Sequence, residues 1–264
     1  MRIAIAQMEI AQGDVEANIA KIRKFIRKAR AGRADVLVLP EYCLTGSVKG
    51  RPELIDSKGA YRRLFSNLAK KSRIDIVSGS FVESEKGKAY NTACYFERGG
   101  RLLGCYRKMN LWHSERERLC PGAEISVFNT RFGKAGLAIC WDLVNPAIFR
   151  KMAQGGAGII YVPSFWSDAR ISNYPSESKN IDALCFVRAF ENECAIAYAN
   201  AAGVYEPGDR LIGHSQLTVP VRGAVKLAAH SRESLLVAEL PKNALARAAK
   251  VYKIRKDIRS GYQR

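Results

Sequence analysis

Three polar residues directly follow apolar segments of the chain, and their types together suit acyl-transfer chemistry. They are Glu41, Lys108 and Cys140. A cysteine thiolate is a strong nucleophile, but a free thiol is only slightly ionised near neutral pH. A carboxylate can remove the thiol proton, and a neighbouring ammonium group lowers the thiol pKa. The residue types therefore predict that Cys140 is a nucleophile assisted by Glu41 and Lys108.

Each of the three residues, taken alone, also fits a structural role. A glutamate in the position of Glu41 is commonly an exposed loop residue, and a lysine such as Lys108 is commonly on the surface. A cysteine such as Cys140 is commonly a buried structural thiol. Histidine is the usual partner of a catalytic cysteine, but the histidines of this chain lack the papain-like context with an orienting Asn or Asp. They are His113, His214 and His230. A Cys–Glu–Lys set would have to work without histidine.

The elements that position these residues begin with a strand, a helix and a second strand. Residues 3–7 form a short apolar run that is typical of a buried strand. Asp14 is a suitable N-cap, and apolar residues then recur at helical spacing until Gly32. Residues 35–39 predict a second buried strand that Pro40 ends. This order favours parallel strands joined by a right-handed crossover.

The rest of the chain continues the alternation of helices and strands. Apolar patterning predicts helices over about 58–72, 146–154 and 177–193, strands at 74–79, 135–140, 158–162, 195–199 and 234–239, and hairpins over 90–106 and 214–229. No linker divides the chain, which predicts one mixed α/β domain over residues 1–264. Ten or more strands are too many for one simple open sheet, whereas two stacked sheets covered by helices would bury them.

The charge of the chain is strongly positive, with 43 Lys and Arg residues against 25 Asp and Glu and a formal net charge of +18. Clustered cations are typical of nucleic-acid-binding proteins. Here no run exceeds two consecutive basic residues, and aromatic residues do not interleave with them. We therefore expect a solvated basic surface and no nucleic-acid partner. The hydrophobic content of 47% excludes a disordered chain.

The seven cysteines show none of the C-x-x-C spacing of zinc sites, so we expect no metal. Their odd number and apolar surroundings predict reduced, mostly buried thiols in a cytoplasmic protein. The apolar run at the N-terminus is too short for a signal peptide. No apolar segment is long enough to predict a membrane span.

Glu41, Lys108 and Cys140 each lie in a longer motif of the chain. The motifs are Leu39-Pro40-Glu41, Tyr106-Arg107-Lys108-Met109-Asn110-Leu111 and Leu137-Ala138-Ile139-Cys140-Trp141-Asp142. In this order and at these separations, they resemble the motifs of the nitrilase superfamily, the carbon–nitrogen hydrolases. Segments that resemble the family's other blocks extend the likeness over nearly the whole chain, among them 3–8, 90–93, 188–192, 213–215 and 255–259. The resemblance implies a four-layer α-β-β-α sandwich with two stacked mixed β-sheets.

The resemblance also implies a Glu-Lys-Cys triad at Glu41, Lys108 and Cys140, with no cofactor. A second glutamate precedes a Pro-Gly pair in the family. Its usual spacing favours Glu115 over Glu117, and a plain charged loop is the alternative.

Three further residues are expected to contact the substrate. The backbone N–H of Trp141 would stabilise an oxyanion, and Phe165 and Trp166 would line an acyl pocket, with core packing as the alternative for these two rings.

The expected reaction is hydrolysis of a small linear amide to an acid and ammonia through a thioester. Nitrilases typically have Cys-Trp-Glu where this chain has Cys140-Trp141-Asp142, which favours an amidase or a carbamoylase. Asn145 and Ala147 depart from the residues common in the family's amidases, so the substrate stays open. N-carbamoyl or ureido hydrolysis and nitrile hydrolysis are the enzymatic alternatives. A nucleic-acid-binding protein on a retained scaffold is the non-enzymatic alternative.

The resemblance also implies a homodimer or larger homo-oligomer.

Overall fold

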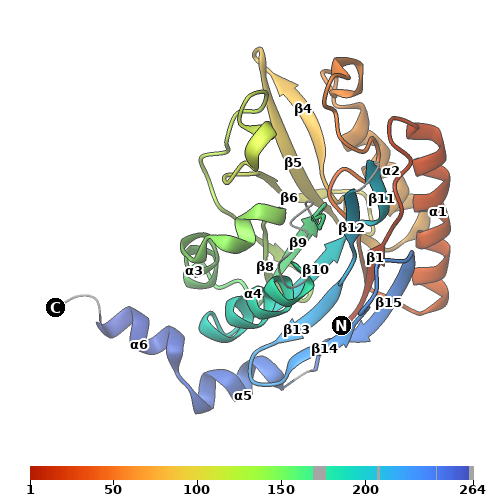
Figure 1. Cartoon of the computed structure of the whole chain (residues 1–264). Coiled ribbons are helices and arrows are strands. Elements are labelled where there is room, and N and C mark those ends of the chain that lie inside the picture. The colour runs from red at the N-terminus through yellow and green to blue at the C-terminus, as the bar shows by residue number, and fades with distance from the viewer. Residues whose placement is uncertain (169–176, 207–208, 242, 262–264) are drawn as a thin grey trace.

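The protein consists of two β-sheets packed face to face, with helices on both outer faces (Figure 1). The structure is a computed structural model that describes residues 1–168, 177–206, 209–241 and 243–261. This four-layer arrangement is the α-β-β-α sandwich that the sequence predicts.

The first sheet is mixed, with strand order β15-β1-β2-β3-β5-β4 and with β6 paired to β5. Its strands are β1 (Arg2–Gln7), β2 (Val36–Val38), β3 (Asp75–Val77), β4 (Phe81–Glu85), β5 (Lys88–Phe96), β6 (Leu102–Arg107) and β15 (Ser234–Glu239). Strands β1, β2 and β3 are parallel, as the predicted crossover requires. Helices α1 (Val15–Ala31) and α2 (Ala60–Ser72) cover the outer face, and the short 3₁₀-helix η1 (Pro52–Leu54) lies between them in the chain.

The second sheet has the order β14-β13-β10-β9-β8-β7. Its strands are β7 (Ser126–Thr130), β8 (Gly133–Leu137), β9 (Ile159–Ser164), β10 (Ala195–Asn200), β13 (Gln216–Val219) and β14 (Gly223–Leu227). Helices α3 (Pro146–Gln154) and α4 (Glu177–Glu191) lie outside it, and β11 (Ala202–Glu206) pairs with β12 (Asp209–Ile212) in a separate ribbon. Helices α5 (Ala244–Val251) and α6 (Ile254–Gly261) follow β15.

Alternation along β1 shows how the layers are held together. Ile3 and Ile5 belong to the core cluster that also contains residues of β8, β9 and β10, so they face the second sheet. Ala4 and Ala6 belong to the cluster that contains the buried residues of α1 and α2. Successive strand residues point to opposite faces, so one strand contributes to two cores.

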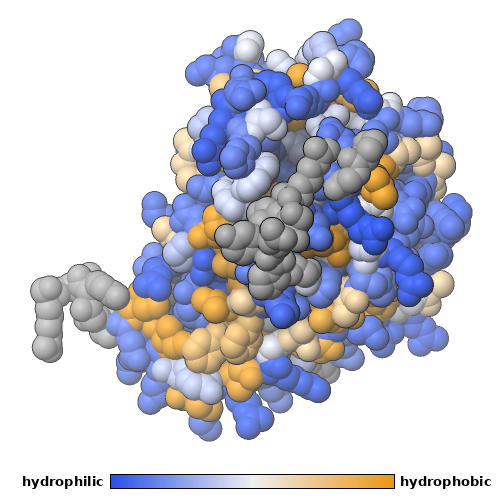
Figure 2. Space-filling model, viewed as in Figure 1, coloured by the Kyte–Doolittle hydropathy of each residue, from blue (hydrophilic) through white to orange (hydrophobic). Residues whose placement is uncertain are grey.

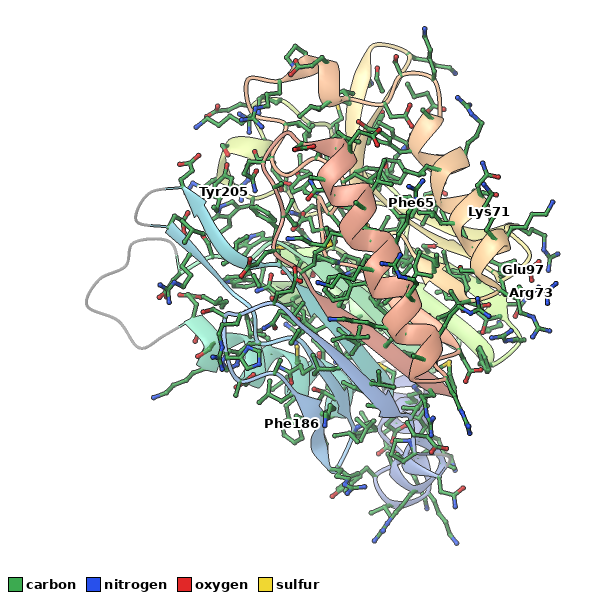
Figure 3. The ribbon with its side chains drawn as sticks, turned by 90° about the vertical axis from the view of Figure 1, so that its right-hand side faces the viewer. Phe65, Lys71, Arg73, Glu97, Phe186 and Tyr205 are labelled. Atoms are coloured by element: carbon green, nitrogen blue, oxygen red, sulfur yellow. A yellow bond between two sulfur atoms is a disulfide. The ribbon has the colours of Figure 1, made fainter. Side chains whose placement is uncertain are left out.

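Helix α1 has the boundaries that its sequence predicts. The Asp14 side chain accepts a hydrogen bond from the Ala17 N–H at 2.9 Å, and Gly32 follows the last turn. The large apolar residues Ile19, Ile22, Phe25 and Ile26 of α1 are buried, whereas most of its basic residues are exposed. On α2, Figure 3 shows Phe65 pointing into the layer beside the sheet and Lys71 pointing outward. The basic residues of both helices therefore form a solvated surface.

Several elements differ from those predicted. The described residues also contain β4, β7, β11, β12, α5 and α6, which the apolar patterning did not indicate. Strand β8 ends at Leu137 rather than at 140, and Cys140 begins a 3₁₀-helix, η3 (Cys140–Val144). The prediction of reduced cysteines is wrong for Cys94 and Cys105, which form a disulfide. These residues lie directly opposite each other on β5 and β6, which places their side chains within bonding distance.

No helix among the described residues is both long and apolar enough to cross a membrane.

Candidate active site

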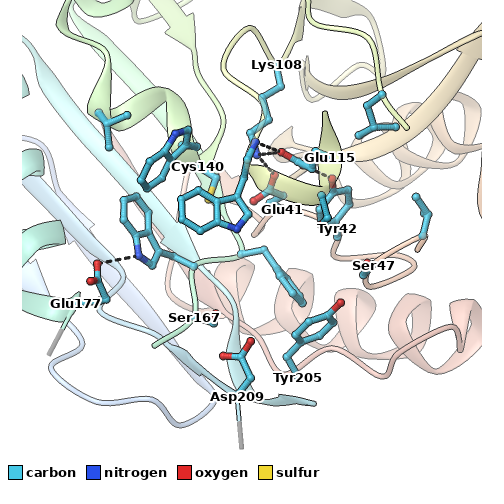
Figure 4. Close-up of a pocket in the computed structure, with 18 of the residues that line it drawn as sticks. Glu41, Tyr42, Ser47, Lys108, Glu115, Cys140, Ser167, Glu177, Tyr205 and Asp209 are labelled. Carbon is cyan, nitrogen blue, oxygen red and sulfur yellow. Dashed lines mark hydrogen bonds and ion pairs between the residues drawn. The ribbon is translucent and has the colours of Figure 1, made fainter. Parts of the chain in front are cut away.

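The structure brings Glu41, Lys108 and Cys140 together at one end of the two stacked sheets (Figure 4). Glu41 lies three residues after the end of β2 and Lys108 directly after β6, both in the first sheet, whereas Cys140 follows β8 of the second sheet. The two sheets are linked here by the Glu41 N–H, which donates to the Ser164 carbonyl oxygen at 3.2 Å. The site therefore depends on the packing of one sheet against the other.

The backbone near Glu41 requires a glycine in a neighbouring segment. Gly79 has a φ of +66°, and a Cβ atom there would lie 2.0 Å from the carbonyl oxygen of Pro40. Only glycine combines this conformation with so close an approach. The segment after β3 can thus pack directly against the segment that carries Glu41.

The Lys108 ammonium group lies between two carboxylates. Its Nζ is 2.9 Å from Oε1 of Glu41 and 2.8 Å from Oε2 of Glu115. Lys108 and Glu41 are each only 1% exposed, and Glu115 is 8% exposed. Glu117, the reserve candidate for the second glutamate, is exposed and does not line the cavity. The structure thus places Glu115, not Glu117, beside Lys108.

Two residues that the sequence did not single out as site residues complete this network. Asn91 Nδ2 lies 2.8 Å from Oε1 of Glu41, 3.1 Å from Oε1 of Glu115 and 3.0 Å from the Tyr42 hydroxyl. The Tyr42 hydroxyl donates to Oε1 of Glu115. The backbone N–H of Lys108 donates to the Asn91 carbonyl oxygen at 2.8 Å. Asn91 therefore ties both carboxylates and the lysine backbone to β5.

The two glutamates differ in their affinity for protons. Burial raises the pKa of Glu41 above its ordinary value, although the charge of Lys108 opposes the rise. Burial acts in the same direction on Glu115, but the charge and hydrogen bond of Lys108, with the Tyr42 hydroxyl and the Trp112 N–H, lower its pKa. Burial lowers the pKa of Lys108, but the charges of the two carboxylates raise it by more, so the pKa lies above its ordinary value. Glu115 and Lys108 therefore form a stable ion pair, and Glu41 is the group suited to exchange a proton.

Cys140 is held as a protonated thiol in a left-handed turn. Burial, together with the charge of Glu41, raises its pKa, while Lys108 and hydrogen bonds from the Ser164 side chain and the Phe165 backbone partly offset the rise. Its φ of +45° is unfavourable for a residue with a Cβ atom, by roughly 1–2 kcal/mol. A thiol in this state needs a base before it can attack a substrate.

The turn that presents Cys140 is anchored by Asp142, which is fully buried. Oδ2 of Asp142 accepts from the Ile139 N–H and the Tyr106 hydroxyl, both at 2.8 Å. Oδ1 accepts from the Asn110 N–H at 2.9 Å and from Asn110 Nδ2 at 3.0 Å. One carboxylate therefore joins the nucleophile turn (residues 139–142) to the segment that carries Lys108.

The three residues open into a cavity of about 640 Å³ with largely aromatic walls. Trp141, Phe165 and Trp166 line it, and their contact with a substrate stays a prediction. The rings of Trp112 and Trp141 lie 4.2 Å apart between centroids, and those of Trp141 and Trp166 lie 5.2 Å apart. Such walls suit a small organic ligand whose reacting group is held by a few polar residues.

No group of three or more His, Cys, Asp or Glu side chains that could hold a metal ion occurs in the described part of the chain. The chemistry that the cavity offers is that of a thiol, a carboxylate and an ammonium group.

Comparisons with known proteins agree with the fold and with the resemblance. A family model described as carbon-nitrogen hydrolase matches residues 2–250. A 2-oxoglutaramate amidase from Bacillus subtilis is 30% identical over 97% of this chain and 97% of its own length. An omega-amidase from Homo sapiens is 28% identical over 93% of this chain and 90% of its own length. The crystal structure of Saccharomyces cerevisiae Nit3, a member of branch 10 of the nitrilase superfamily, superposes with a TM-score of 0.87 at 26% identity, over 98% of this chain and 96% of that one.

Proposed function

The chain belongs to the carbon–nitrogen hydrolase family, and on that basis we propose that it is a cysteine amidase that converts a small linear amide to an acid and ammonia. The observation that carries this proposal is the Lys108 ammonium group, held between Glu41 and Glu115 at the end of the cavity where Cys140 lies. The names of the relatives from Bacillus subtilis and Homo sapiens support an amide as the substrate. N-carbamoyl compounds and nitriles are the alternatives that an assay has to separate from amides.

The first half of the proposed reaction forms a thioester. Glu41 takes the thiol proton while the sulfur of Cys140 attacks the amide carbonyl carbon, which forms a C–S bond. The oxyanion that develops is stabilised by Lys108 and by the backbone N–H of Trp141, and one such donor contributes about 3–4 kcal/mol in comparable sites. Glu41 then gives its proton to the amide nitrogen, the C–N bond breaks, and ammonia leaves.

The second half releases the acid. Water attacks the thioester carbonyl and gives a proton to Glu41, and this proton returns to the sulfur of Cys140 as the C–S bond breaks. Glu115 does not take part in these transfers, because its lowered pKa favours the carboxylate. It holds the Lys108 ammonium group in place and maintains its charge.

The test is an assay of ammonia release from parallel panels of linear amides, N-carbamoyl amino acids and nitriles. We expect turnover of amides by the wild-type protein and none by Cys140→Ser. Cys120→Ser is the matched control, because Cys120 is a free thiol outside the cavity that is neither buried nor disulfide-bonded. Ammonia release from the carbamoyl or nitrile panel alone would contradict the amide proposal. Salt-sensitive polynucleotide binding by Cys140→Ala, with no turnover by the wild type, would favour the binding-protein alternative.

We also propose a homodimer or larger homo-oligomer that forms through α4 and α5. Phe186 and Val187 on α4 are 40% and 44% exposed, and Val251 and Tyr252 at the end of α5 are 62% and 42% exposed. Figure 2 shows hydrophobic residues gathered on the lower part of this face, where Figure 1 places these helices. Sedimentation of the wild type and of Val187→Asp tests this surface.

A single catalytic domain over residues 1–264 is proposed on similar grounds. Strand β15, late in the chain, pairs with β1 near the start of the chain. The described residues that line the cavity come from segments as far apart in the sequence as Glu41 and Asp209. A cytoplasmic location is proposed because most described cysteines are free, namely Cys43, Cys120, Cys140, Cys185 and Cys194, whereas the Cys94–Cys105 disulfide is more usual in an oxidising compartment.

A further inference from the structure

The end of the cavity away from Lys108 is lined by two carboxylates that the proposed reaction does not use. Glu177 begins α4 and Asp209 begins β12, and both line the same cavity as Cys140. Figure 4 shows them on the opposite side of the cavity from Lys108, with aromatic rings in between. A substrate whose amide group lies at Cys140 would extend its other end toward these two residues.

Neither carboxylate forms an ion pair with a described cation. Within the described part of the chain, the donors to Oε2 of Glu177 are neutral, and they are Trp166 Nε1 at 3.3 Å and Asn180 Nδ2 at 3.2 Å. Oδ1 of Asp209 is buried and has no hydrogen-bond partner among the described residues. Buried carboxylate oxygens normally have donors, and no described donor offsets the negative charge that Asp209 brings to the cavity wall.

The described cations that line the cavity do not balance these charges. Among the described lining residues they are Lys108 and Arg118. Lys108 is paired with Glu41 and Glu115, and Arg118 is exposed to solvent, which screens its charge. The described residues therefore make the part of the cavity beyond Cys140 negative, and Glu177 and Asp209 would repel a carboxylate placed there.

The aromatic walls add to the attraction for a cation. The Trp166 ring donates a hydrogen bond to Glu177 and lies beside the Trp141 ring. The Phe165 and Tyr205 rings meet edge to face, with centroids 5.1 Å apart. The faces of such rings attract ammonium and guanidinium groups, and their apolar area also packs against a methylene chain.

We propose that Glu177, Asp209 and the neighbouring aromatic rings form a subsite for a cationic group, so that the substrate is a linear amide whose far end carries an ammonium or guanidinium group. This inference rests on the proposed amidase activity and names its substrate class.

The test compares three amides of similar length that differ at the far end. They are 5-aminopentanamide, which is cationic, pentanamide, which is neutral, and the monoamide of glutarate, which is anionic. We expect kcat/KM to fall in that order, with the cationic amide favoured over the neutral one by about tenfold at low salt, as for a partly buried cation that meets carboxylates and aromatic faces. High salt should reduce this ratio.

Variants of Glu177 and Asp209 test whether these residues cause the preference for the cationic amide. Asp209→Asn and Glu177→Gln should each lower the ratio of kcat/KM for the cationic amide to that for the neutral amide, and the double variant should reduce it to about one. Asp168→Asn is the matched control, because Asp168 is exposed and does not line the cavity, and it should leave the ratio unchanged. The neutral amide reports in every variant whether the catalytic site is folded.

The outcomes separate the two proposals. Hydrolysis of pentanamide with no preference for the cationic amide, or with a preference for the anionic one, would overturn the subsite and leave the amidase intact. A cationic preference that survives in the double variant would also overturn it. If none of the three amides releases ammonia, and the broader amide panel is also inactive, the proposed amidase function itself is wrong.

Discussion

Replacement of Asp142 by asparagine tests how the nucleophile turn is held. The carboxylate accepts four hydrogen bonds, from the Ile139 N–H and the Tyr106 hydroxyl on Oδ2 and from two donors of Asn110 on Oδ1. An asparagine has nearly the same shape but replaces one of these oxygens with an NH₂ group. The variant therefore changes the hydrogen bonding of the turn and leaves its packing almost unaltered.

The cost depends on which way the new amide points. If the NH₂ group faces Asn110, two donors lose their acceptor. If it faces Tyr106, the tyrosine hydroxyl can rotate and accept, so only the Ile139 N–H loses its partner. One buried donor without an acceptor costs about 1–3 kcal/mol. The cheaper orientation thus predicts a loss of about 1–3 kcal/mol in the free energy of unfolding, with the damage at the start of the turn that carries Cys140.

Urea unfolding and amide hydrolysis measure the two consequences. We expect Asp142→Asn to lower the free energy of unfolding by this amount and kcat by at least about tenfold, because a small displacement of the nucleophile has a large effect on rate. Asp168→Asn makes the same chemical change at an exposed position and should stay within about 0.5 kcal/mol of the wild type. A stability within that limit together with unchanged kcat in Asp142→Asn would refute the role of Asp142 as the anchor of the turn.

Three further predictions concern the charges of the site. The kcat/KM for a neutral amide should rise with pH through a midpoint above 4.5, because Glu41 acts as a base only when deprotonated and burial raises its pKa; a midpoint at or below 4.5 would contradict this. The ultraviolet absorbance of a thiolate at Cys140 should be absent at pH 8, because burial raises the pKa of this thiol. A thiolate absorbance at pH 8 in the wild type that is lost in Cys140→Ser would show that Cys140 is ionised and would contradict this prediction. Lys108→Met should lower the free energy of unfolding by about 3–5 kcal/mol, because Glu41 and Glu115 lose their buried counter-charge. An unchanged urea midpoint would show that the ammonium group is not needed to balance them.

Much of the site could be predicted because its main residues follow strands. Apolar segments that end in a polar residue place that residue at the end of a sheet, where clefts form. Glu41 and Lys108 lie after β2 and β6, as this pattern predicts. The predicted strand ended at Cys140, three residues after the end of β8, because the apolar pattern continues through Ala138 and Ile139. Periodicity does not detect a left-handed turn at a cysteine.

The contacts between strands were harder to predict. Asn91 lies in the middle of β5, and its role depends on which side chains the neighbouring segments bring to it. One signal was available, because a polar amide inside a buried strand must find hydrogen-bond partners. Likewise, the pairing of Cys94 with Cys105 could have been predicted from the hairpin over 90–106, because its turn places these two residues opposite each other.

Glu177 and Asp209 had no such signal. They reach the cavity from α4 and from β12, elements whose relative positions follow from the packing of the whole fold. Tertiary arrangement of this kind is not encoded in local periodicity.

In the proposed reaction, Cys140 forms a thioester with the acyl group of an amide substrate. Mass spectrometry of the protein quenched during turnover of a linear amide tests it most directly. We expect a mass increase equal to the acyl group on the peptide that contains Cys140, absent in Cys140→Ser and present in Cys120→Ser. Turnover by Cys140→Ser, or an acyl group on another cysteine while the Cys140 peptide stays unmodified, would show that Cys140 is not the nucleophile.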